Sequence, residues 1–157
     1  MQLTQKERML LTDQQSHEEI CIEKYTNYAR QVQDPQLQQM FTGYAQQERQ
    51  HYQTLDQLLR GQEPPVQQKG HQQGNRQQPQ GRQQAQGRSG MLDENDKQLL
   101  TDMLMTEKYI SSTYDTAVFE AAHPAVRQAL QHIQKEEQQH GEGIFNYMNQ
   151  HGMYQPS

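Results

Sequence analysis

An internal repeat is the feature that most limits what this chain can fold into. Shifting the sequence by 89 residues, without a gap, aligns Leu10–Asp13 with Leu99–Asp102, and both segments read Leu-Leu-Thr-Asp. Over residues 10–59 the same shift gives 11 identities in 50 positions. The chain therefore reads as two copies of one supersecondary unit, each of which needs the other to bury its apolar face.

Each copy carries the signals of a helical hairpin. Pro35 and Pro124 occupy equivalent positions, and proline is favoured in the first turn of a helix. Gly61 and Gly152 follow the last periodic apolar residues and are placed to end the second helix of each copy. We expect helices near residues 5–33, 36–59, 94–121 and 125–150.

A long polar segment separates the two copies. Residues 60–90 hold 11 Gln, 6 Gly and 3 Pro but only two apolar residues, Val66 and Ala85. Such a segment cannot bury a core, so we expect a disordered linker over 61–91 between a first hairpin, 1–60, and a second hairpin, 92–157. Two tight hairpins joined by a long crossover predict one all-α domain of 1–157, a ferritin-like four-helix bundle.

Composition excludes several other classes of protein. The longest apolar runs are a few residues, too short to span a membrane, and the N-terminus lacks the pattern of a secretory signal. A single cysteine, Cys21, rules out an intrachain disulfide and a cysteine-based metal site. The net charge of -5 argues against nucleic acid as the main partner. We therefore expect synthesis in the cytoplasm without a signal peptide.

Six polar residues stand where the helical periodicity requires core residues. They are Glu18, Glu48, His51, Glu107, Glu137 and His140. In each copy the glutamate of the first helix lies 16 residues before the turn, and the Glu-x-x-His pair lies 14 and 17 residues after it. Antiparallel packing therefore places all six at one height in the bundle.

The six residues form a set suited to two metal ions. Four buried carboxylates without opposite charge would be very unfavourable, whereas two divalent cations would balance them and use both imidazoles as neutral ligands. One Glu from each of two helices and Glu-x-x-His from each of the others is the ligand set of di-iron and di-manganese carboxylate bundles. The sequence thus predicts a dinuclear centre of iron or manganese, with zinc as a further option. The alternative is a bundle that has kept inherited polar positions after losing its metal.

Most other polar residues near these positions are expected to have no part in the centre, although Tyr25 and Tyr114 lie close enough to affect it. We expect Tyr25 and Tyr114 to serve in packing and Cys21 to be a small residue at the edge of the core. We expect solvated surface positions for the remaining neighbours, namely Glu19, Glu23, Glu136, Glu142, His17, His71, His132 and His151.

The second half resembles the coat F family of spore coat proteins. The resemblance rests on Leu104–Tyr109, Pro124–Leu130, Glu137–His140 and the ending Tyr147–Tyr154, where this chain has Met153 in place of the usual aromatic residue after the glycine. The first half is similar to the other hairpin of related coat proteins. The resemblance implies a ferritin-like fold, expression during sporulation, other spore coat proteins as partners, self-association and a location in the spore coat.

The six core residues also resemble the ligands of rubrerythrin and bacterioferritin. That resemblance implies a second function, a di-iron or di-manganese oxidoreductase acting as a peroxidase, ferroxidase or catalase-like enzyme. Rubrerythrins carry in addition a cysteine-rich electron-transfer domain, which this chain lacks. The leading hypothesis is a structural and assembly protein of the coat, and the sequence leaves open whether it is also an enzyme.

Overall fold

The computed structural model describes residues 1–65 and 94–154, and this part of the chain forms four α-helices and no strand. The helices are α1 (Gln5–Gln31), α2 (Pro35–Leu59), α3 (Glu94–Glu120) and α4 (Pro124–Gln150). The predicted all-α, four-helix fold is confirmed, and every predicted helix end lies within two residues of the observed one. Most of the predicted linker, 61–91, lies outside the described residues.

Local chemistry fixes the helix ends. Thr4 and Glu7 form a capping box at the start of α1, in which each side chain accepts a hydrogen bond from the other's backbone N–H. Asp34 caps α2 through a backbone N–H of its first turn. Gly61 and Gly152 have φ values of 75° and 66°, the left-handed conformation in which glycine ends a helix.

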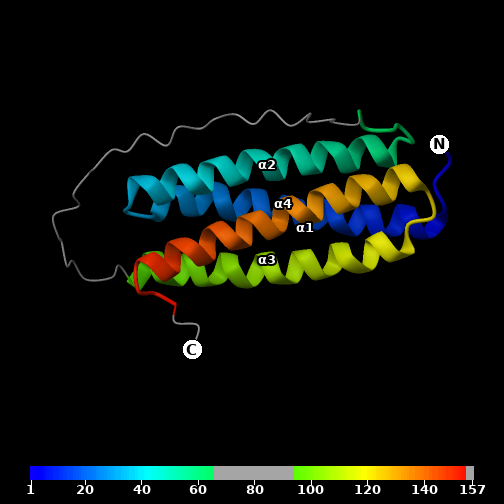
Figure 1. The fold of residues 1–157 in the computed structure, drawn as a ribbon. Helices are drawn as coiled ribbons and strands as arrows, with labels where there is room; N and C mark the ends of the chain where they lie inside the picture. Colours follow the sequence, from blue (N-terminus) through cyan, green and yellow to red (C-terminus); the bar gives the residue numbers. More distant parts are fainter. Residues whose placement is uncertain (66–93, 155–157) are drawn as a thin grey trace, which may run out of the picture.

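The helices form a bundle in which each one contacts two others (Figure 1). Within the hairpins α1 packs along α2 and α3 packs along α4, and between them α1 contacts α3 and α2 contacts α4. α2 and α3 run in the same direction, so the end of α2 and the start of α3 lie at opposite ends of the bundle. A tight turn could therefore not join α2 to α3.

The apolar core is divided by a polar middle section. On α2, Leu37 and Phe41 are buried toward the hairpin turn, and Leu55 and Leu58 are buried toward the other end. The polar residues Glu48 and His51 occupy the buried positions between these two apolar zones. α4 shows the same division, so the polar sections of the helices meet halfway along the bundle.

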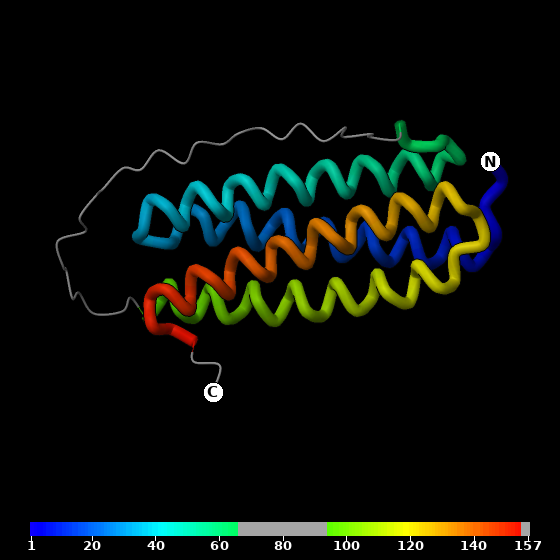
Figure 2. Tube along the Cα trace, viewed as in Figure 1, coloured from blue at the N-terminus to red at the C-terminus, as the bar shows by residue number. Residues whose placement is uncertain are grey.

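Each hairpin turn is held by a carboxylate from the other hairpin. Glu7 Oε1 accepts hydrogen bonds from the backbone N–H groups of Ala122 and His123 in the α3–α4 turn, each at 2.8 Å. Asp96, the repeat equivalent of Glu7, accepts from the backbone N–H of Gln33 after α1 at 3.2 Å. In Figure 2 each turn lies beside the start of a helix from the opposite hairpin, and this arrangement allows both contacts.

Loss of the Glu7 carboxylate should cost about 2 kcal/mol of unfolding free energy, since it would leave partly buried backbone N–H groups without their acceptor. Glu7→Ala tests this by urea denaturation. Glu120→Ala removes only an ion pair with Lys6, whose side chain is 63% exposed, and should cost less than about 1 kcal/mol. Equal losses in the two variants would contradict a special role for Glu7.

Candidate metal centre

The six predicted residues gather in the polar middle of the bundle, and we call them the Glu/His cluster. α1 and α3 each contribute one glutamate, and α2 and α4 each contribute a glutamate and a histidine one turn later. All are at most 2% exposed, which no isolated charged side chain would tolerate. The members are Glu18, Glu48, His51, Glu107, Glu137 and His140.

The cluster contains two overlapping groups of potential metal ligands. One group is Glu18, Glu48, His51 and Glu137, and the other is Glu48, Glu107, Glu137 and His140. Within each group the potential ligand atoms lie within 4.8 Å of one another. Glu48 and Glu137 belong to both groups, as residues shared by two neighbouring cations would.

The closest contacts in the cluster cross between the hairpins. His51 Nδ1 on α2 lies 2.8 Å from Glu137 Oε1 on α4. His140 Nδ1 on α4 lies 2.7 Å from Glu48 Oε1 on α2. The Nδ1 atom of each histidine therefore faces the carboxylates, and each Nε2 atom points toward residues outside the cluster.

Every member of the cluster has at least one buried oxygen or nitrogen atom without a hydrogen-bond partner. These atoms are Glu18 Oε2, both Glu48 oxygens, His51 Nε2, Glu107 Oε2, Glu137 Oε2 and His140 Nδ1. Glu48 Oε1 and His140 Nδ1 lie 2.7 Å apart, but they are not oriented for a hydrogen bond. A buried polar atom without a partner is costly, and so many in one place are rare in folded proteins. Coordination to cations would satisfy the carboxylate oxygens and the inward nitrogen together, so the residues fit a metal centre.

The protein environment shifts the acid–base behaviour of the cluster. Burial, with the neighbouring Glu18 carboxylate, raises the pKa of Glu48 to about 7. Burial, with the Glu137 carboxylate, raises the pKa of Glu107 to about 8. Burial alone would lower the pKa of His140, but the facing carboxylates outweigh it and raise that pKa to about 12. Without metal, the cluster therefore retains protons that balance its negative charge.

Two buried tyrosines hold cluster carboxylates across the hairpin interface. The Tyr25 hydroxyl on α1 donates to Glu107 on α3, and the Tyr114 hydroxyl on α3 donates to Glu18 on α1. Both tyrosines are fully buried, and burial together with the adjacent carboxylates raises their pKa well above the usual value. The packing role predicted for them is incomplete, because their hydroxyls also fix two candidate ligands. The sequence signal for this role is that the two tyrosines occupy equivalent places in the repeat, each two helical turns after a core glutamate.

The Nε2 atom of each cluster histidine lies near a side chain outside the cluster, and the two side chains, Gln47 and Glu136, are equivalent in the repeat. His140 Nε2 is hydrogen-bonded to Gln47 Oε1, and His51 Nε2 lies 3.4 Å from Glu136 Oε1. Glu136 in turn contacts Nε2 of His132 at 2.7 Å. The prediction of a solvated surface position for Glu136 is therefore wrong: its side chain is only 17% exposed, because it turns inward toward His51. His140 thus has a hydrogen-bonded orienting partner in Gln47, whereas His51 Nε2 lies near Glu136 without a hydrogen bond.

The remaining neighbours divide between surface and core. Glu19, Glu23, Glu142, His132 and His151 are exposed, as predicted. His17 is half-buried and contacts Gln14 and Tyr109, while His71 lies outside the described residues. Cys21 is fully buried in the core and not at its edge.

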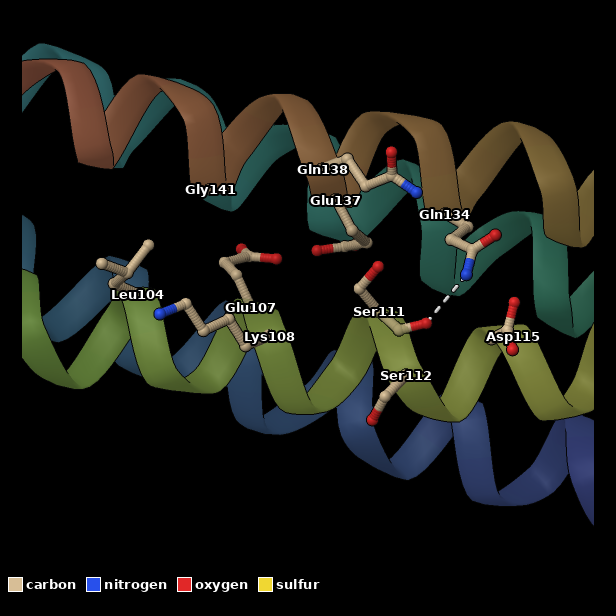
Figure 3. Close-up of a pocket in the computed structure, with 10 residues that line it drawn as sticks. All are labelled: Leu104, Glu107, Lys108, Ser111, Ser112, Asp115, Gln134, Glu137, Gln138 and Gly141. Carbon is tan, nitrogen blue, oxygen red and sulfur yellow. Dashed lines mark hydrogen bonds between the residues drawn. The ribbon is translucent and has the colours of Figure 1, made fainter. Parts of the chain in front are cut away.

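A cleft of about 520 Å³ between α3 and α4 reaches one side of the cluster. Glu107 and Glu137 line it, and Figure 3 shows their side chains directed toward each other from the two helices. Ser111 and Gly141 form part of the walls, and Lys108 also lines the cleft. Two candidate ligands thus adjoin a space from which small molecules could approach.

Carboxylate and imidazole ligands in this number suit iron, manganese or zinc, and nothing in the donor set selects among them. The acidic side chains also balance the charge of two divalent ions without any group from outside the bundle. The cluster therefore offers two overlapping groups of residues, each of which could hold a metal ion, with Glu48 and Glu137 common to both groups.

Comparison with known proteins gives a family match for the second hairpin and a match to a bacterial relative. Residues 95–157 match the model of the Coat F domain. A 60-residue segment is 35% identical to the uncharacterized protein YusN of Bacillus subtilis strain 168. This match covers 38% of the present chain and 54% of YusN, so the chain spans about half the length of this curated relative. No solved structure matches the chain.

Proposed function

We propose that this protein, a member of the coat F family through residues 95–157, is a structural and assembly protein of the bacterial spore coat. Its bundle is a single ferritin-like domain, since the parallel α2 and α3 require the long crossover typical of that fold. Other coat proteins and further copies of this chain are its partners. Fold and family alone do not assign chemistry, so the interior site must carry any further claim.

The bundle binds two divalent metal ions at the Glu/His cluster, with iron or manganese as the main candidates and zinc as a third. The observation that supports this proposal is the set of buried, unpartnered carboxylate oxygens on all four glutamates, together with the inward Nδ1 of His140. Tyr25 and Tyr114 hold Glu107 and Glu18 in place by hydrogen bonds. When bound, such metals supply Lewis acidity and, if they are iron or manganese, redox chemistry.

The proposed location of this protein in the spore coat is supported only by the match to the Coat F domain. No described helix is both long enough and apolar enough to cross a bilayer. The net charge of -5 gives no basis for binding nucleic acid. Residues 66–93 are rich in Gln and include Lys69, so transglutaminase cross-linking of this segment within the coat is part of the proposal.

Glu48→Ala and Glu137→Ala should each reduce the metal content from two ions per chain to less than one, because each residue belongs to both ligand groups. Elemental analysis of protein expressed with added iron or manganese measures this. Glu142→Ala is the matched control on α4, since Glu142 is exposed, and it should retain two ions. Wild-type protein without metal would contradict the proposed centre.

An oxidoreductase is the second candidate function. The cleft that brings Glu107 and Glu137 next to an open space favours it, because a metal used only for structure needs no access. The described helices provide no cysteine-based electron-transfer site, so an external reductant would be required for peroxidase turnover. Peroxide consumption by metal-loaded protein, compared with chelated protein, decides between the two functions.

A further inference from the structure

Two glycines lie in the middle of α4, although glycine is a poor helix former. A Cβ atom at Gly143 would overlap the Tyr44 hydroxyl, so packing explains that glycine. A Cβ atom at Gly141 would meet only Glu107 Cβ, at 3.8 Å, which is ordinary contact. Close packing therefore gives no reason for glycine at position 141.

Gly141 lines the cleft between α3 and α4, so its missing side chain leaves space there. Ser111 lines the same cleft from α3, also with a small side chain. Glu107 and Glu137 form the inner part of the lining, and each has a buried Oε2 atom without a hydrogen-bond partner. The small residues thus adjoin unsatisfied candidate ligands.

The first hairpin differs at the matching places. Under the 89-residue shift, Ser111 corresponds to Ile22 and Gly141 corresponds to Tyr52. Both of these larger residues are half-buried. Ile22 lies one helical turn after Glu18 on α1, and Tyr52 lies one helical turn after Glu48 on α2. The two halves therefore supply the same candidate ligands but different walls around them.

We propose that the cleft between α3 and α4 admits a small polar ligand, of the size of peroxide or azide, to the Glu107 and Glu137 side of the centre. On the corresponding side of the first hairpin the larger residues Ile22 and Tyr52 stand at the matching positions. This inference rests on the proposed metal centre and adds to it a direction of access. Lys108 and Asp115 both line the cleft, and their opposite charges offset each other.

Azide binding to cobalt(II)-loaded protein tests the proposal, because the absorption spectrum of cobalt(II) reports added ligands. Gly141→Tyr, which copies the first hairpin, should weaken azide binding at least tenfold while two metal ions per chain remain. Ser111→Ile should act in the same direction from α3. Gly43→Tyr is the matched control, because Gly43 lies on α2 with nothing within 4 Å of its Cβ position, and it should bind azide like wild type.

The outcomes separate the two proposals. Unchanged azide binding by metal-loaded Gly141→Tyr and Ser111→Ile would overturn the access route and leave the metal centre intact. Loss of metal from both variants would mean that the cleft walls support the ligands instead of admitting one, and would also overturn it. Wild-type protein that takes up no cobalt would overturn the metal centre and the access route together.

Discussion

Removing the metal should lower the melting temperature of the protein by at least about 10 °C at pH 7. A ligand that binds only the folded state, at about 1,000 times its dissociation constant, adds roughly 4 kcal/mol to the free energy of unfolding. For a chain of this size, 1 kcal/mol corresponds to roughly 3 °C. After removal, the buried carboxylates of the cluster depend on protons retained at Glu48, Glu107 and His140 to balance their charge.

Calorimetry of metal-loaded protein with and without a chelator measures the effect. Glu48→Ala provides the internal control, because a variant that holds less than one ion should melt at nearly the same temperature with and without the chelator. Identical melting curves for the wild-type protein in the two conditions would identify the cluster as the remnant of a lost site. The oxidoreductase function would then be abandoned, and the coat protein function would stand alone.

The fold was predictable because each structural signal occurs twice. Pro35 and Pro124 mark the same point in both hairpins, and Gly61 and Gly152 mark the ends that follow. The repeat also made the cluster predictable, since a single Glu-x-x-His pair is weak evidence and two equivalent pairs at one height are strong. Periodicity shows which face of a helix is buried, and that was enough to bring the six residues together.

Periodicity does not show which helix each buried face will meet, and the missed contacts all depend on that information. The hydrogen bond from Tyr25 to Glu107 requires α1 to lie beside α3, which no local pattern encodes. The contact of Glu7 with the α3–α4 turn has the same origin. Glu136 was misplaced because its inward partner, His51, comes from α2. Such contacts become predictable only once the pairing of the hairpins is known.

Metal-free protein should be most stable near pH 5 and should melt at least about 5 °C lower at pH 8. The usual pKa of a glutamate here is about 4.5, whereas burial and neighbouring carboxylates raise the pKa of Glu48 to about 7 and that of Glu107 to about 8. The folded state therefore binds protons that the unfolded state has released, and its stability falls as pH rises from 4.5 to 8. His140, whose pKa is raised to about 12, acts in the same direction above pH 6.5.

The trend reverses below pH 4.5 because of carboxylates outside the cluster. Burial would raise the pKa of Glu7, but its hydrogen bonds from the His123 and Thr4 backbones hold it at about 2. The stability that Glu7 contributes is therefore present above pH 4.5 and is lost as pH falls toward 2.

Metal-loaded protein should show the opposite slope between pH 5 and 8, since ligands must lose their protons to bind and affinity rises with pH. Melting curves at pH 5, 6, 7 and 8, with and without chelator, should therefore diverge steadily as pH rises. A metal-free protein that is more stable at pH 8 than at pH 5 would show that the buried carboxylates do not repel one another as their positions require.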